Sequence, residues 1–189
     1  MAQLIFKYGT MGSSKTANAI MMAYDFEHKG LNILFVKPDL EDRDGKNIVK
    51  SRIGLERECT LWSNFKLMDL KNVNKIIVDE AHFLTEEDID YLSNIVDTLN
   101  IDVLCFGLRT DFQTHLFSGS KRLLEIADKI EEIENTCWCG EHAIINARID
   151  QNQNIVKDGD QIVLGGDGVY IAVCRKHYKE NMINKFGKF

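Results

Sequence analysis

Short apolar runs alternate with amphipathic segments over the first two-thirds of the chain. The apolar runs are residues 3–8, 32–37, 75–79 and 102–107. Near-continuous apolarity of this kind is typical of parallel strands that are covered on both faces. Because longer segments with helical spacing separate these runs, the pattern predicts βαβ units and an open α/β sheet.

Three of the intervening segments are predicted to be helices. Residues 15–29 end at a glycine, a common helix stop, and carry one apolar stripe. That stripe consists of Ala17, Ile20, Met21 and Tyr24. In 85–99, Thr85 and Asp88 fit a capping box ahead of apolar residues at helical spacing. The segment 120–130 is a weaker third helix.

The character of the chain changes after about Asn135. Two strand-rich segments, 136–150 and 161–178, flank a polar stretch that contains glycine. A β module at 136–189 is too small to build much core by itself and needs a staple. We therefore expect a nucleotide-binding domain at 1–135 followed by this module.

The segment between the first strand and the first helix, residues 9–16 (the Gly9 loop), has the spacing of a phosphate-binding loop. In such loops backbone N–H groups converge on phosphate, a lysine reaches the terminal phosphates and a hydroxyl binds magnesium. Gly9, Lys15 and Thr16 fit the G-x-x-x-x-G-K-[ST] pattern, whereas Ser14 replaces its second glycine. The remaining members are Thr10, Met11, Gly12 and Ser13. The alternative is a strand-to-helix turn of small residues.

An acidic pair, Asp79 and Glu80, follows the third apolar run. A carboxylate at the carboxyl end of a buried strand, beside a phosphate loop, is where nucleotide-binding proteins hold magnesium. Asp79 fits that role, and Glu80 can act on the nucleophile. Polar residues that simply end a strand are the alternative, but the Gly9 loop and the pair each predict the other. The letters DEAH do not indicate a helicase, since the chain is too short for two motor domains.

Four residues that can bind zinc occur as two close pairs, Cys137-x-Cys139 and Cys174-x-x-His177. Two such pairs beside predicted β segments can converge on one tetrahedral zinc. Four protein ligands leave no position for catalytic water, so the role is structural. Four unrelated residues are the alternative, and His142 is a competing ligand. The resulting fold class is α/β: a P-loop parallel sheet flanked by helices, with a small zinc-stapled β domain.

Composition narrows the partners and the compartment. A net charge of −6 and a pI of about 5.4 provide no global basic field for nucleic acid or an acidic membrane. The N-terminus lacks the features of a signal peptide, and no stretch approaches the length of a membrane span. Five cysteines, an odd number, without a secretion signal indicate a reducing compartment. We expect a cytoplasmic protein.

Several motifs together carry a family resemblance. They are the loop start at 9–11, DEAHF at 79–83, GLRTDFQ at 107–113, and the CWC and CRKHY pairs on either side of LGGDGVY. In this order they resemble the zinc-containing thymidine kinases of the cellular type, from residue 3 to about 180. The resemblance implies ATP-dependent, Mg²⁺-assisted phosphorylation of the 5′-hydroxyl of thymidine, with deoxyuridine as a second acceptor.

The resemblance also implies roles for individual residues. Lys15 stabilises the transferring phosphoryl group, and Arg43 matches a catalytic arginine that the family places near the phosphates. Thr16 binds magnesium, Asp79 holds it through water, and Glu80 is the base. The thymidine pocket is formed by Met11, Phe83, Leu108, Phe112, Asn146, Val163 and Tyr170. A lasso anchored by structural Zn²⁺ closes over the nucleoside. The family is usually a homotetramer, which we carry over as an expectation.

Two departures and two other functions stay open. Ser14 alters the phosphate loop, and at Asn146 the family more often has threonine. A non-catalytic ATP- and zinc-binding regulatory module would bind nucleotide without turnover, yet it would not require Glu80. A P-loop kinase for another small acceptor would differ only in its substrate.

Overall fold

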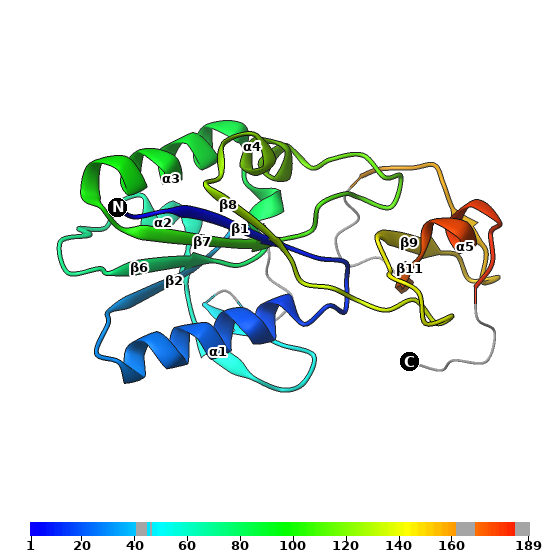
Figure 1. Cartoon of the computed structure of the whole chain (residues 1–189), viewed down its shortest axis with the longest axis horizontal. Helices are drawn as coiled ribbons and strands as arrows, with labels where there is room; N and C mark the ends of the chain where they lie inside the picture. Colours follow the sequence, from blue (N-terminus) through cyan, green and yellow to red (C-terminus); the bar gives the residue numbers. More distant parts are fainter. Residues whose placement is uncertain (41–44, 46, 162–168, 184–189) are drawn as a thin grey trace.

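The computed structural model describes residues 1–40, 45, 47–161 and 169–183 (Figure 1). Its centre is a six-stranded sheet in the order β5-β2-β6-β7-β1-β8, in which every neighbouring pair is parallel. The strands are β1 (Leu4–Tyr8), β2 (Ile33–Lys37), β5 (Thr60–Leu61), β6 (Lys75–Val78), β7 (Asp102–Gly107) and β8 (Lys129–Glu132). The predicted open parallel sheet is confirmed.

Helices cover both faces of this sheet. Helix α1 (Lys15–His28) lies on one face, and α3 (Glu86–Leu99) and α4 (Ser118–Ile126) lie on the other (Figure 1). Along β7, Val103 and Cys105 join the cluster under α3 and α4, whereas Leu104 and Phe106 join the cluster under α1. Burial of both faces explains why the strands are almost continuously apolar in sequence.

The predicted start of α3 is confirmed in detail. The Asp88 N–H donates to Thr85 Oγ1 (3.2 Å), and the Thr85 N–H donates to Asp88 Oδ2 (3.3 Å). This reciprocal capping box satisfies two of the donors that a helix start leaves open.

Helix α1 packs differently from the prediction. Met21 and Tyr24 are 60% and 67% exposed, whereas Ala19 and Ala23 are fully buried beside Ile20. Small side chains let the helix approach the sheet closely, so the buried stripe is centred on alanines and the larger residues face solvent.

The third helix is also shorter than predicted. It ends at Ile126, and Lys129–Glu132 forms β8, which pairs with β1 at the edge of the sheet. Asp128 directs the turn into this strand: its N–H donates to the Leu4 carbonyl (2.9 Å) and its carboxylate accepts from the Leu4 N–H (2.7 Å). Pairing with a distant strand outweighs the local helical pattern.

The remaining elements are short. They are the antiparallel hairpin of β3 (Ile48–Lys50) and β4 (Glu56–Glu58), helix α2 (Trp62–Phe65), the 3₁₀ turn η1 (Ala81–Phe83), the antiparallel sheet β10-β9-β11, and α5 (Arg175–Lys179). In that sheet β9 is Ile145–Ile149, β10 is Ile155–Val156 and β11 is Val169–Val173. The second predicted β segment thus ends at Val173 and continues as a helix.

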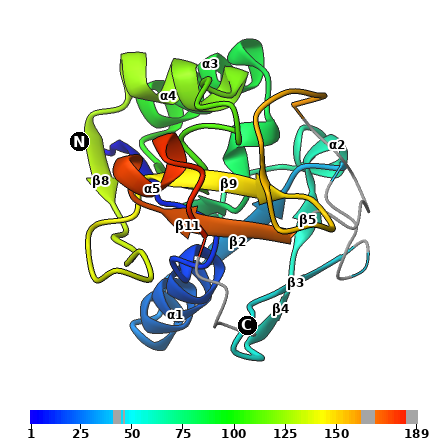
Figure 2. The same cartoon turned by 90° about the vertical axis from the view of Figure 1, so that its right-hand side faces the viewer.

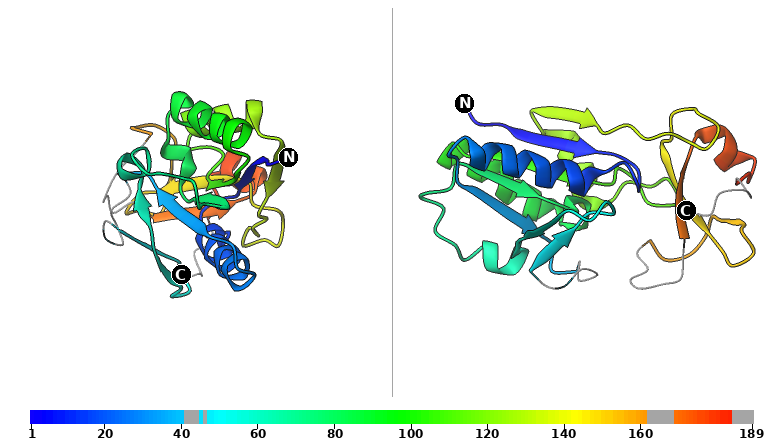
Figure 3. Two further views of the ribbon diagram at one scale, coloured as in Figure 1. Left: turned by 90° about the vertical axis from the view of Figure 1, so that its left-hand side faces the viewer. Right: turned by 90° about the horizontal axis from the view of Figure 1, so that it is seen from below.

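The small sheet lies beyond the carboxyl edge of the parallel sheet (Figures 2 and 3). Strands β1, β6 and β7 all end toward it, because parallel strands share one carboxyl edge. A division of the chain at 135/136 stays a prediction. Within the described ranges, no helix combines the length and apolarity required to cross a bilayer.

Candidate functional site at the carboxyl edge

The Gly9 loop turns tightly between β1 and α1. The Gly9 N–H donates to the Gly107 carbonyl at the end of β7 (3.2 Å), and the Ser13 N–H donates to the Thr10 carbonyl (3.2 Å). A Cβ on Gly9 would lie 2.4 Å from Ser13 Oγ and 2.5 Å from the Ile133 carbonyl oxygen. Only glycine fits this position, because two segments approach its backbone closely.

Ser14 has a left-handed backbone, with φ 62° and ψ 28°, immediately before α1. Its carbonyl accepts the Asn18 N–H (2.9 Å), so the residue initiates the helix. At the position where a phosphate loop usually has its second glycine, Ser14 thus adopts a left-handed conformation that favours glycine. For serine this conformation costs about 1 kcal/mol.

Lys15 is buried and folds back along the loop. Its Nζ donates to the Thr10 carbonyl (2.8 Å). Burial lowers the pKa of Lys15, and the charges of Glu80 and Asp79 partly offset that effect. A buried ammonium group has lost the solvation of its charge by water, and a bound anion would stabilise that charge in place of water.

Asp79 joins the end of β6 to the start of α1. Thr16 Oγ1 donates to Asp79 Oδ2 (2.8 Å), whereas Asp79 Oδ1 is buried and has no hydrogen-bond partner in the described part of the chain. Burial, followed by the charge of Glu80, raises the pKa of Asp79 to about 7. The unpartnered Asp79 oxygen and the neighbouring Thr16 hydroxyl are the kind of oxygen ligands that a hard divalent cation such as Mg²⁺ prefers.

Glu80 also has a left-handed backbone, with φ 52°. Its Oε2 lies 3.4 Å from His82 Nδ1, and that nitrogen accepts the Leu108 N–H (3.2 Å). An imidazole nitrogen that accepts a hydrogen bond carries no proton, so Nδ1 is the unprotonated nitrogen of His82 in this arrangement. The strained backbone directs the carboxylate to the carboxyl edge, next to Asp79.

Aromatic rings gather beside Glu80. The Phe83 ring lies 4.0 Å from the His82 ring and 6.0 Å from that of Phe117, and Leu108 is half-buried nearby. The sequence analysis did not single out Phe117. It follows Leu116 directly before α4, so it resembles an ordinary apolar residue at a helix start.

Asn146 connects the small sheet to the Gly9 loop. Its Oδ1 accepts the Met11 N–H (2.7 Å), and its Nδ2 donates to the Thr110 carbonyl (3.0 Å). Asn135 adds bonds from its Nδ2 to Thr10 Oγ1 and the Met11 carbonyl, both 3.0 Å. Asn146 thus binds protein backbone on both sides, and its place in the thymidine pocket stays a prediction.

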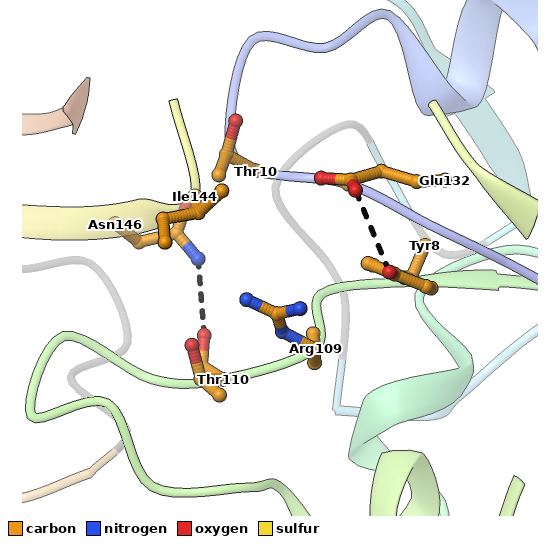
Figure 4. A pocket seen from close by; sticks show the side chains of 8 residues that line it. Tyr8, Thr10, Arg109, Thr110, Glu132, Ile144 and Asn146 are labelled. Atoms are coloured by element: carbon orange, nitrogen blue, oxygen red, sulfur yellow. Dashed lines mark hydrogen bonds between the residues drawn. The ribbon is translucent and has the colours of Figure 1, made fainter. Parts of the chain in front are cut away.

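A small cleft opens at this junction (Figure 4). Its lining comprises Tyr8, Gly9, Thr10, Arg109, Thr110, Glu132, Ile144 and Asn146. Of the predicted site residues, only Gly9, Thr10 and Asn146 belong to it. Lys15 and Glu80 lie outside this cleft.

Two other predicted pocket residues lie at the small sheet. Phe112 is only 1% exposed, and the Arg148 guanidinium lies 4.0 Å from the centre of the Phe112 ring. The Phe112 carbonyl accepts a hydrogen bond from the Tyr178 hydroxyl (2.8 Å). Tyr170 pairs with Arg148 between β11 and β9. Arg43 and Val163 lie outside the described residues.

The four predicted metal ligands come together. The ligand atoms of Cys137, Cys139, Cys174 and His177 all lie within 4.8 Å of one another. His177 Nδ1 is 3.4 Å from the sulfurs of Cys137 and Cys174, and the Cys139 and Cys174 sulfurs are 4.0 Å apart. These separations suit tetrahedral ligands around zinc at about 2.0–2.3 Å.

Other histidine and cysteine residues that the structure describes do not belong to this cluster. Trp138 stacks on His177 with ring centres 4.1 Å apart. His142 lies outside the cluster, and its Nε2 contacts Glu132 Oε1 at 2.9 Å. Cys105 is buried in the main core, far from it in the fold. The cluster can hold zinc.

Comparison with known proteins agrees with this architecture. The family model for thymidine kinase matches residues 2–178. The thymidine kinase of Zymomonas mobilis is 40% identical over 96% of this chain and 98% of its own length. Those of phage T4 and Streptococcus pyogenes are 41% and 43% identical, covering 95% and 94% of this chain and 97% of each relative. A match of this extent leaves one conclusion: the chain belongs to the thymidine kinase family.

Proposed function

We propose that this protein transfers the γ-phosphate of ATP to the 5′-hydroxyl of thymidine, with deoxyuridine as a further acceptor. The observation that carries the proposal is the convergence of Lys15, Thr16, Asp79 and Glu80 at one edge of the parallel sheet. The Thr16–Asp79 hydrogen bond of 2.8 Å joins the two segments that supply them. Membership of the thymidine kinase family supports the choice of acceptor.

The Gly9 loop would hold the triphosphate. Its N–H groups and the start of α1 provide positive potential, and Lys15 would leave the Thr10 carbonyl to contact the terminal phosphates. Thr16 and the unpartnered oxygen of Asp79 are the oxygens suited to Mg²⁺, which when bound neutralises phosphate charge. Binding of the cation would keep Asp79 ionised despite its burial.

Glu80 would orient the 5′-hydroxyl and accept its proton. Phosphoryl transfer has a loose transition state, so positioning and charge neutralisation supply most of the rate enhancement. Phe83, Leu108 and Phe117 would form an apolar wall for the pyrimidine, as in flat nucleoside pockets. Arg43, Met11, Phe112, Val163 and Tyr170 keep the phosphate and pocket roles that the resemblance implies.

The module at 136–189 would serve as the lasso. Structural zinc at the cysteine–histidine cluster would fix β9 relative to α5, and Asn146 would transmit that fixed position to the Gly9 loop. Closure over the nucleoside would exclude water from the γ-phosphate and limit idle hydrolysis. A cytoplasmic location and a homotetramer remain expectations of the family resemblance.

A nucleoside panel tests the proposal. Purified protein is incubated with ATP, Mg²⁺ and each of the common nucleosides, and the 5′-monophosphates are quantified. Thymidine and deoxyuridine are expected to be converted. Glu80→Gln should lower kcat by about 10²–10⁴-fold while ATP binding persists.

Glu87→Gln, an exposed carboxylate on α3, is the matched control and should leave kcat unchanged. Nucleotide binding without turnover of any nucleoside would instead indicate a regulatory module. Turnover confined to another acceptor would indicate a kinase of different specificity. Near-normal turnover in Glu80→Gln would remove Glu80 from its role.

A further inference from the structure

The tip of the β3–β4 hairpin is a tight and well-bonded turn. The Ser51 N–H donates to the Leu55 carbonyl (2.8 Å), and the Gly54 N–H donates to the Ser51 carbonyl (3.0 Å). The buried Ser51 hydroxyl accepts the Leu55 N–H (2.9 Å), and Gly54 has φ 86°. Side chains of this tip therefore project from a fixed backbone.

The hairpin is anchored to the body of the protein beside α1 (Figures 1 and 2). Arg57 on β4 donates from Nη1 to Glu27 Oε2 on α1 (2.9 Å), and its guanidinium lies 5.6 Å from the Phe35 ring centre. Val49 on β3 is buried in the core cluster under α1, which includes Ile20. These contacts fix the hairpin against α1 and the core cluster beneath it.

Arg52 extends from this tip over the Gly9 loop. Its Nη1 lies 3.9 Å from the place that a Cβ on Gly12 would occupy. Its charge also lowers the pKa of Lys15, after the larger effect of burial, so the two cations lie within electrostatic range. Arg52 has no hydrogen bond or ion pair to any residue that the structure describes.

We propose that Arg52 is a phosphate ligand that contacts the triphosphate of the nucleotide held by the Gly9 loop. The inference rests on the proposed function, because it needs ATP at this loop. Two like charges without an anion between them repel, whereas a polyanion between them is attracted to both. A guanidinium presents paired N–H donors that match phosphate oxygens, and it keeps its charge throughout the reaction.

The role differs from that of Lys15. Lys15 belongs to the loop itself, whereas Arg52 approaches Gly12 of that loop from a separate hairpin. Arg52 forms and breaks no covalent bond; it neutralises charge on the phosphate chain, and charge neutralisation is the main catalytic effect in phosphoryl transfer. The β3–β4 hairpin thus contributes directly to the nucleotide site.

The experiment compares Arg52→Gln, Arg52→Lys and Lys50→Gln in the full-length protein. Initial rates are measured at varied ATP with saturating thymidine, then at varied thymidine with saturating ATP. Arg52→Gln should lower kcat/KM for ATP by about 10- to 100-fold, with KM for thymidine within about 2-fold of wild type. Arg52→Lys should recover part of the loss, because it keeps the charge but not the paired donors.

Lys50→Gln is the matched control on the same hairpin, because it removes a positive charge from the half-exposed ion pair of Lys50 with Glu56. It should leave the melting temperature nearly unchanged, and kcat/KM for ATP should stay within about 2-fold of wild type. Arg52→Gln should leave the melting temperature of the ligand-free protein unchanged. An unchanged kcat/KM for ATP in Arg52→Gln, or an equal loss in both glutamine variants, would overturn the inference. Wild-type protein that phosphorylates no nucleoside would instead overturn the proposed function.

Discussion

Replacing Asp79 by asparagine should stabilise the ligand-free protein at alkaline pH while it impairs catalysis. Asp79 is 2% exposed, and its pKa is raised from 3.8 to about 7, chiefly by burial. The folded state therefore binds more protons than the unfolded state between these two values, and stability declines as pH rises through this window. Asparagine carries no charge and still accepts the Thr16 hydroxyl hydrogen, so it escapes this loss.

The magnitude follows from the shift. A difference of about 3 pKa units corresponds to about 4 kcal/mol, which is the upper limit of the effect at high pH. About 1.5 units of the window lie above pH 5.5, so the stability difference between variant and wild type should widen by about 2 kcal/mol from pH 5.5 to pH 8.5. For a chain of this size that equals roughly 4–8 °C in Tm.

The assay is thermal unfolding of both proteins at the two pH values, without magnesium or nucleotide. Asp97→Asn, an exposed carboxylate on α3, is the control and should show a pH-independent difference. The cysteine–histidine cluster is common to wild type and both variants, so its own response to pH cancels. A difference that does not change with pH, or a variant less stable than wild type at pH 8.5, would refute the reasoning about the buried charge.

Three further predictions concern other features of the site. Ser14→Gly should raise the free energy of unfolding by roughly 0.5–1 kcal/mol in urea titrations by relieving the left-handed strain, whereas Ser13→Gly should lower it. Purified protein should contain about one zinc per chain, and chelation should change the fluorescence of Trp138 but not that of buried Trp62; less than half an equivalent, with folding intact, would contradict the metal site. Asn146→Ala should lower the free energy of unfolding by about 1–3 kcal/mol and raise KM for ATP, because it removes the hydrogen bonds that connect the small sheet to the Gly9 loop. An unchanged free energy of unfolding together with an unchanged KM would contradict this connecting role.

Much of the fold could be predicted from local sequence patterns. The strands at 4–8, 33–37, 75–78 and 102–107 could be predicted because burial on both faces leaves a continuous apolar signature. The start of α3 could be predicted because its capping box lies within four residues. The convergence of the Gly9 loop and Asp79 followed from the shared carboxyl edge of parallel strands.

Features that depend on distant partners could not be predicted in the same way. Strand β8 forms because it pairs with the edge of β1, and the sequence of residues 129–132 does not indicate that partner. The two backbone segments that the Asn146 amide binds, at Met11 and Thr110, lie far from it in sequence and are brought next to it by the fold. The place of Asn146 in a thymidine pocket stays a prediction. Arg52 sits in a turn whose sequence resembles any exposed loop, and only the docking of the hairpin on α1 brings it over Gly12.

The position of the cysteine–histidine cluster along the chain has a consequence for biosynthesis. All six strands of the parallel sheet have been translated by Glu132, whereas Cys174 follows Cys139 by 35 positions. At about 5–20 residues per second, a ribosome needs about 2–7 s to deliver the second pair of ligands after the first. The sheet that carries the Gly9 loop can thus assemble first, and the four residues of the cysteine–histidine cluster come together as one of the last events in the folding of the nascent chain.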